Sequence, residues 1–239
     1  MPVIAPAETA RATRRRASSN GTPFWFTSYI GANRYTRAAG AGDPVEGAIY
    51  PMAFLVEQDA NCTVGAHYHQ ADQFQVIVGG GGSLGRHPVA PVAVHFAGAF
   101  TAYGPLRAGP EGLHYFTLRN GWDPGARYME FPDNRTTLRH TPRQHREAVL
   151  EGAEALLAPE SDGLAAWRYR LAAGERLTGE APRGGAGQHW LVVAGSLLRD
   201  EQELPTKSCM FVYPDEPPFS GTAGPDGLDV VVMQFPRRN

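Results

Sequence analysis

His67 and His69 lie two residues apart, with Tyr68 between them, in a segment rich in residues that suit an extended strand. Side chains two residues apart on a strand point to the same face, so the two imidazoles would face one space. A short polar turn at residues 70–72 then leads into an apolar run. If that run folds back antiparallel, it brings Gln73 beside the histidines. Neutral imidazoles and an amide oxygen together suit a borderline first-row metal ion, so the segment predicts a metal site on a β-hairpin.

Composition and charge narrow the classes of partner. The chain has 239 residues, of which 22 are basic and 24 acidic. This balance lacks the excess of basic residues that is typical of nucleic-acid-binding proteins. No apolar run reaches the roughly 18 residues of a membrane span. Cys62 and Cys209 are the only cysteines. No disulfide framework is therefore expected, and a cytoplasmic location is predicted. We expect a small-molecule substrate and neither a nucleic-acid nor a membrane partner.

The first 48 residues are predicted to form a tail and an aromatic arm. Four arginines lie between residues 11 and 16, and no apolar segment follows them. This pattern argues against a secretory signal and favours a solvated flexible tail over an organelle transit peptide. Residues 22–48 contain many aromatic side chains, among them Phe24, Trp25, Phe26, Tyr29 and Tyr35. We expect this arm to pack across a barrel or against a second subunit.

The chain repeats itself at an offset of 115 residues. Residues 108–113 (AGPEGL) recur as residues 223–228 (AGPDGL). At the same offset Gln73 matches Gln188, and the run VIVGG at residues 76–80 matches LVVAG at residues 191–195. Matches so widely spaced at one offset indicate two copies of one unit, over residues 50–132 and 165–236.

Each copy is predicted to be all-β, because short apolar runs alternate with clusters drawn from the 28 glycines and 20 prolines. Between the copies, Thr141, Pro142 and Gln144 form a helix-capping pattern, and Pro159 ends the apolar stripe that follows. The predicted domains are therefore the tail and arm (1–48), a metal-binding barrel (49–138), a linker helix (139–160) and a second, degenerate barrel (161–239).

The first copy resembles the cupin superfamily. The first cupin motif contains Gly, then His-x-His, then Glu three or four residues later and Gly six residues after that. Here His67 and His69 are followed after three residues by Gln73 and after six more by Gly80. The second motif, Pro-x-Gly followed by His, is matched with a shorter interval by residues 110–114 (PEGLH). The resemblance covers nearly the whole repeat. It implies two tandem cupin-type double-stranded β-helix (jelly-roll) barrels joined by a short helix, in other words a bicupin.

The resemblance also implies which residues bind the metal. His67 and His69 would be ligands, together with Gln73 and His114. Gln73 departs from the family, which commonly has Glu at this place, so the site is neutral and binds a divalent cation more weakly. Gln73 is either a ligand or a group that orients an imidazole or a bound water. His95 is the alternative third histidine, although it comes early for the second motif. The implied cofactor is a divalent transition metal, with Fe(II) favoured over Mn, Ni, Zn and Cu.

The second copy lacks these ligands. At the 115-residue offset the three histidines correspond to Pro182, Gly184 and Asp229. We therefore expect the second barrel to be metal-free and structural, with the function concentrated in the first.

The expected function is that of a metal-dependent cupin enzyme acting on a small organic molecule. A dioxygenase with a non-haem Fe(II)-type centre is the first choice, because the site is neutral and histidine-rich. Isomerase or lyase chemistry, which needs only a Lewis acid, and a non-enzymatic binding or sensing cupin are the alternatives. Tyr103 lies near the expected mouth of the barrel and is the candidate substrate-binding residue; no catalytic acid or base is assigned. A homodimer is expected, since cupins often pair through N-terminal arms.

Overall fold

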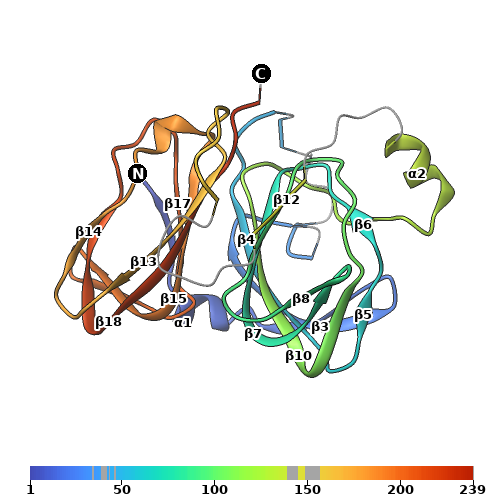
Figure 1. The fold of residues 1–239 in the computed structure, drawn as a ribbon, viewed down its shortest axis with the longest axis horizontal. Helices are drawn as coiled ribbons and strands as arrows, with labels where there is room; N and C mark the ends of the chain where they lie inside the picture. The colour runs from blue at the N-terminus through green and yellow to red at the C-terminus, as the bar shows by residue number, and fades with distance from the viewer. Residues whose placement is uncertain are drawn as a thin grey trace. The chain divides into compact units, whose positions relative to one another are not determined.

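The computed structural model describes residues 1–33, 35–38, 42, 44–45, 47–138, 157–238 and the backbone of 145–148. Two compact units are present. The first barrel comprises Thr13–Leu150, and the second comprises Met1–Ala12 together with Glu151–Asn239. Both are built mainly from antiparallel strands (Figure 1), which confirms the prediction of two all-β copies. Within the described residues, no helix is long and apolar enough to cross a membrane.

The first barrel is built around one large antiparallel sheet, with strands in the order β12-β9-β7-β10-β4-β3-β2. Two short strands also pair with this sheet, β5 with β10 and β8 with β7. Strands β6 and β11 form a separate two-stranded sheet. A short helix, α2 (Pro132–Leu138), follows β11. The strands are β2 (Arg15–Ser19), β3 (Thr22–Ile30), β4 (Met52–Gln58), β5 (Thr63–Val64), β6 (His67–Tyr68), β7 (Gln73–Leu84), β8 (His87–Val89), β9 (Val94–Ala97), β10 (Leu106–Arg119), β11 (Arg127–Tyr128) and β12 (His145–Ala148).

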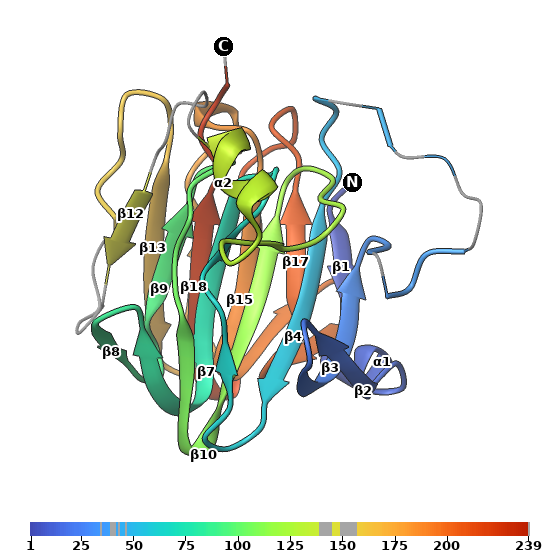
Figure 2. The same cartoon turned by 90° about the vertical axis from the view of Figure 1, so that its right-hand side faces the viewer.

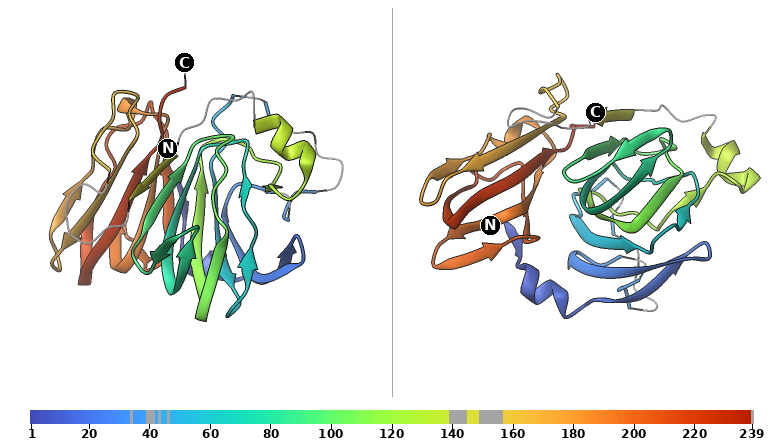
Figure 3. Two further views of the ribbon diagram at one scale, coloured as in Figure 1. Left: turned by 45° about the vertical axis from the view of Figure 1, so that its right-hand side comes forward. Right: turned by 60° about the horizontal axis from the view of Figure 1, so that its bottom comes forward.

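The long pair β7–β10 lies at the centre of this sheet, with β4 and β3 beside it (Figure 2). Its register places Gln73 opposite Arg119. Because side chains alternate along a strand, Tyr115, Thr117 and Arg119 share one face of β10. All three line the interior cavity, whereas Phe116 packs against Tyr29 on the other face. In the right-hand view of Figure 3, the cyan and green strands of this unit curl round a common interior.

The second barrel is built on a sheet with strands in the order β1-β17-β15-β18-β13. In addition, β14 pairs with β18 and β16 pairs with β15. The blue N-terminal strand β1 belongs to this sheet, paired with β17 (Figure 1). A five-residue helix, α1 (Ala7–Arg11), follows β1. The strands are β1 (Val3–Ala5), β13 (Ala165–Leu171), β14 (Arg176–Thr178), β15 (Gln188–Arg199), β16 (Gln202–Pro205), β17 (Cys209–Val212) and β18 (Ser220–Gln234), and a 3₁₀ turn spans Pro182–Gly184.

The sequence repeat is also a repeat of strand register. Gln188 lies opposite Gln234 on β15 and β18, at positions 115 residues beyond the Gln73–Arg119 pair. The two copies also share a glycine contact. A Cβ at Gly80 would lie 2.2 Å from a backbone oxygen of β10, and a Cβ at Gly195 would lie 2.1 Å from one of β18. Only glycine fits such a close approach of two strands, so the same crossing is conserved between the two halves of this chain.

The interior of the second barrel is filled with apolar side chains. At the 115-residue offset, Trp190 stands where the first barrel has Gln75, and Met210 stands where it has His95. Valines replace Tyr115 and Thr117. Trp190, Met210 and these valines (Val230 and Val232) are fully buried in one hydrophobic cluster. The second copy has therefore exchanged the polar interior of the first for a packed core.

Two predictions about the ends of the barrels are wrong. Residues 1–12 are not a solvated tail, because β1 and α1 are part of the second unit. The predicted linker helix is contradicted at His145–Ala148, which form β12 and pair with β9. The other residues of that prediction between 139 and 156 lie outside the described part of the chain. The capping pattern is local, whereas β12 gains ladder hydrogen bonds from β9, so tertiary pairing outweighs local propensity.

The aromatic arm is confirmed as part of the first barrel. Its strand β3 pairs with β4 along residues 24–30 and with β2 on its other side, so the arm is an inner strand of the sheet. Phe24 and Phe26 are buried, and both rings contact Tyr35. Pairing with a second subunit stays a prediction.

Candidate functional site

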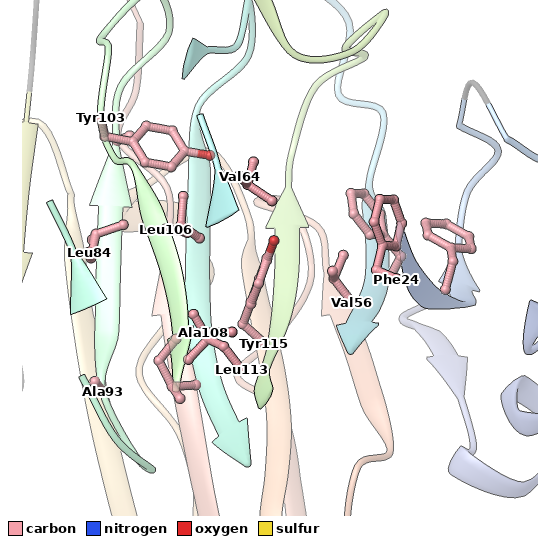
Figure 4. Close-up of a cluster of buried hydrophobic side chains, with 14 of the residues drawn as sticks. Phe24, Val56, Val64, Leu84, Ala93, Tyr103, Leu106, Ala108, Leu113 and Tyr115 are labelled. Carbon is pink, nitrogen blue, oxygen red and sulfur yellow. The ribbon is translucent and has the colours of Figure 1, made fainter. Parts of the chain in front are cut away.

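A cavity with about 600 Å³ of empty space, part of it open to solvent, lies inside the first barrel. One wall is the inner face of β7, β10 and β4, which contributes Gln73, Gln75, Thr117 and Phe54. The facing side is formed by the short β6–β11 ladder, in which His67 pairs with Tyr128. In Figure 4 the hydroxyl groups of Tyr103 and Tyr115 point into the same space.

His67 is fixed at both ring nitrogens. Its Nδ1–H donates to the Gly65 carbonyl oxygen at 2.7 Å, and its Nε2 lies 3.0 Å from the Tyr103 hydroxyl, which donates to it. Tyr103 is held opposite by reciprocal backbone hydrogen bonds with His67 of 3.0 and 3.1 Å. Burial lowers the pKa of His67 to about 3, and the neighbouring His69 adds to this effect. His67 is therefore neutral at pH 7, the form that binds metals.

His69 is held by a buried carboxylate. Its Nδ1 lies 2.8 Å from Asp123 Oδ1. The same carboxylate accepts backbone N–H bonds of 2.8 Å from Gln70 and Gly125. Burial acts to raise the pKa of Asp123, but the charge of Arg119, with Nη1 at 3.3 Å, and the contact with His69 outweigh it, so the pKa lies below its usual value. Asp123 is thus ionised and can only accept, which assigns the proton of His69 to Nδ1.

Gln73 and Arg119 complete a continuous polar network. Arg119 donates from Nε and Nη2 to Gln73 Oε1, at 3.1 and 2.7 Å. The amide nitrogen of Gln73 donates to the Tyr103 hydroxyl at 2.6 Å. Arg119 Nη2 also lies 3.0 Å from His69 Nδ1, but with the His69 proton on Nδ1 both atoms are donors, so this contact is not a hydrogen bond. The network therefore runs from His67 through Tyr103, Gln73 and Arg119 to Asp123, and its two formal charges cancel.

The donor set fits a divalent metal at the two histidines. Metal-binding histidines almost always donate their second ring N–H to a carboxylate or a backbone carbonyl. His67 and His69 do so, to Gly65 and to Asp123, and their ring centroids lie 5.1 Å apart. Both would bind a metal through Nε2. Within the described residues no three His, Cys, Asp or Glu side chains form a metal cluster. Any further protein ligand would be a neutral oxygen, from Gln73 or Tyr103.

His114 does not line this cavity, contrary to its predicted place among the ligands. Tyr115 faces inward on β10, and His114, its neighbour in sequence, therefore faces outward. It lies instead in a surface hollow with Trp25 and Glu57. His95 is the histidine that approaches the site. Its Nδ1 lies 3.2 Å from Gln75 Oε1, and its ring centroid lies 5.0 Å from that of Tyr103.

Arg119 and Asp123 line the cavity, and no sequence motif indicated either of them. Residues 123–125 read as a turn, and Arg119 reads as the charged end of an apolar strand. One signal was available for Arg119. Arg119 is the last residue of β10, and Gln234 is the last residue of β18. The two correspond at the 115-residue offset that also relates Gln73 to Gln188. No spacing rule connects Asp123 to His69, because the loop brings them together across 54 positions.

Replacing Tyr103 by phenylalanine should destabilise the metal-free protein by about 1–3 kcal/mol, because buried groups of His67 and Gln73 lose their shared partner. Urea unfolding in the presence of a chelator measures the loss. Tyr169→Phe is the control, since that tyrosine is only partly buried in the second barrel. An equal effect of the two substitutions would contradict the network.

No family model and no curated protein matches the sequence. Solved structures do match its fold. The nickel(II) complex of the pirin YhhW from Escherichia coli has a TM-score of 0.61 at 13% identity, over 100% of both chains. A candidate dioxygenase from Nostoc punctiforme has a TM-score of 0.64 at 11% identity, over 98% of this chain and 82% of the other.

A third match is oxalate decarboxylase from Bacillus subtilis, a protein with Mn(II) centres. Its TM-score is 0.53 at 9% identity, over 100% of this chain and 78% of the other. These proteins are members of the cupin superfamily, and at such low identity the likeness concerns the fold. Each copy has the cupin fold, and the chain as a whole has the fold of a bicupin.

Proposed function

We propose that the first barrel is a metal-dependent cupin enzyme in which His67 and His69 hold a divalent transition metal and the cavity binds a small organic substrate. The observation that carries the proposal is the pair of Nδ1 contacts, to a backbone carbonyl and to a buried carboxylate. They fix the tautomer of both rings so that Nε2 is the ligating atom of each. The bound metal would supply Lewis-acid or redox chemistry.

The residues around the histidines have separate roles. Asp123 orients His69 and, with Arg119, keeps the site neutral. Tyr103 offers a hydroxyl oxygen beside His67, and the Gln73 amide nitrogen holds that hydroxyl in place. Aromatic rings, among them Phe24, Phe54, Tyr115 and Tyr128, form the apolar walls. Such a cavity binds an organic molecule largely through its apolar surface and fixes its orientation with a few polar groups.

Within this proposal, a dioxygenase with an Fe(II)-type centre is the first choice. Two neutral histidines and neutral oxygen donors leave the metal with its full charge, which an anionic substrate or reduced oxygen would balance. The fold is shared with a candidate dioxygenase, which is compatible with this choice. An isomerase or lyase would use the same residues without oxygen. Oxygen uptake against a panel of thiols, diketones and catechols distinguishes the two: uptake with any of them supports the dioxygenase, and uptake with none supports the isomerase or lyase.

A second candidate function is that of a metal-free binding or sensing cupin. One observation favours it: the Arg119 guanidinium lies 2.7 Å from Gln73 Oε1, and the Tyr103 hydroxyl occupies His67 Nε2. A metal at this place has to displace the hydroxyl and sit near a permanent cation. Under this alternative the polar network itself is the binding surface.

Titration of the chelator-treated protein with Ni(II) tests the proposal. We expect about one equivalent to bind, and His67→Ala and His69→Ala each to weaken binding by at least tenfold. His114→Ala is the matched control, because it removes a histidine from the same barrel but outside the cavity, and it should bind Ni(II) as the wild type does. The metal proposal fails if less than about a tenth of an equivalent binds, or if the cavity variants bind as tightly as the control.

A further inference from the structure

Asn33 carries a buried amide that is fixed in the wall of the cavity. Its side chain is buried, with 4% of the residue exposed, and it lines the same cavity as the two histidines. The amide oxygen accepts a 2.8 Å hydrogen bond from the backbone N–H of Tyr35. Its backbone is also bound, since the N–H donates to the Thr36 hydroxyl at 2.9 Å and the carbonyl accepts from the N–H groups of Thr36 and Arg37. The side chain therefore cannot turn away from the cavity without breaking this turn.

The amide nitrogen of Asn33 has no hydrogen-bond partner among the described residues. A buried donor left without a partner costs about 1–3 kcal/mol, so buried polar groups in native proteins normally have one. The cavity that Asn33 lines is the place from which a partner can come. An acceptor atom on a molecule bound in the cavity would supply this partner.

The surroundings of Asn33 define the rest of that molecule. Phe24, Phe54 and Tyr35 line the cavity with it, and Phe24 lies edge-on to Tyr35 at 6.0 Å between ring centroids. Aromatic walls suit a flat apolar body. In the metal-free cavity the buried charges of Arg119 and Asp123 pair with each other, so they leave no net charge to attract an ion. A neutral ligand fits the metal-free cavity, in which the inference is tested, better than an anion.

We propose that Asn33 is the specificity-determining donor of this cavity and that it selects a small aromatic molecule bearing a carbonyl oxygen. This inference rests on the proposed function in so far as it names the class of substrate for the same site. The Asn33 N–H donates to the carbonyl oxygen, the ring packs between the aromatic walls, and the far end of the molecule extends toward the histidines.

Two probes of nearly equal shape test the inference: acetophenone, which has the carbonyl oxygen, and ethylbenzene, which lacks it. Binding is measured by ligand-observed NMR on chelator-treated protein, so the result does not depend on whether a metal binds. We expect the wild type to bind acetophenone about tenfold more tightly than ethylbenzene, as one buried hydrogen bond implies. Asn33→Ala should lose this preference while it still binds ethylbenzene to within about threefold of the wild type.

Asn33→Ser provides a second variant, because a serine hydroxyl can still accept from the Tyr35 N–H but is too short to reach the ligand. Asn61→Ala, at an exposed position, is the matched control and should keep the wild-type preference. The inference is overturned if the wild type shows no preference for acetophenone, or if either Asn33 variant that folds retains it. A failed Ni(II) titration with a retained preference would overturn the metal proposal alone.

Discussion

Asp123→Asn should destabilise the first barrel by about 3–5 kcal/mol, because it removes one charge of a buried ion pair and leaves Arg119 without its counterion. The carboxylate side chain is fully buried and accepts four contacts, from His69, Arg119 and two backbone N–H groups. An asparagine can offer only one oxygen to these donors. Guanidinium unfolding of wild type and variant at pH 7, in the presence of a chelator, measures the difference.

The sign of the pH dependence follows from the lowered pKa of Asp123. A carboxyl group that is more acidic in the folded state stabilises the protein at pH values above its unfolded pKa, near 3.8. That contribution is lost as the pH falls from there through the lower, folded pKa. The wild type should therefore lose this stabilisation as the pH falls below 3.8, whereas Asp123→Asn has none to lose. The difference in unfolding free energy between the two proteins should shrink accordingly.

Asp59→Asn is the matched control for Asp123→Asn. Asp59 also pairs with an arginine, through contacts of 2.6 and 2.8 Å to Arg16, but this pair is exposed. Surface ion pairs contribute little to stability, so the control should unfold at nearly the wild-type denaturant concentration. If both substitutions had the same small effect, the buried network would not be a structural part of the site.

Trp190→Ala should destabilise the second barrel by about 3–5 kcal/mol, the usual cost of removing a buried tryptophan. Trp190 is fully buried, its ring contacts Phe219 at 5.0 Å between centroids, and its Nε1–H donates to Gln188. The substitution would open a cavity at the position that corresponds to Gln75, a residue that lines the cavity of the first barrel. Thermal unfolding monitored by calorimetry measures the loss.

Trp25→Ala is the control for Trp190→Ala. Trp25 is only partly buried and lies under the guanidinium groups of Arg14 and Arg16 at the surface of the first barrel. It should cost much less. A Trp190 variant as stable as the Trp25 variant would mean that the second barrel is not a solid core, and the contrast between the two copies would be wrong.

The fold could be predicted because it is repeated in the sequence. The offset of 115 residues is the same for the glycines, for the apolar runs and for the pair Gln73 and Gln188, and it can be read from the sequence alone. In the structure the two copies have corresponding strand registers. His67 and His69 could be found for a similar reason, because their spacing of two fixes a common face wherever the strand lies. Both inferences need only local geometry.

The residues that could not be predicted depend on contacts distant in sequence. His114 matches the second motif loosely, yet it follows Leu113 and precedes the inward-facing Tyr115 on β10, which places it on the outer face of that strand. Asp123 reaches His69 through a loop. The N-terminal strand β1 is hydrogen-bonded to β17, which lies more than 200 positions away in the sequence. No pattern within residues 1–12 predicts this pairing.

The central claim is that His67 and His69 bind one metal ion between them. Crystals of the Ni(II)-loaded protein, measured at the nickel absorption edge, test it directly. We predict one anomalous peak inside the first barrel, about 2.0–2.1 Å from Nε2 of both histidines, as is usual for a zinc–imidazole bond. A peak at His114, or nickel bound with neither cavity histidine in contact, would contradict the account.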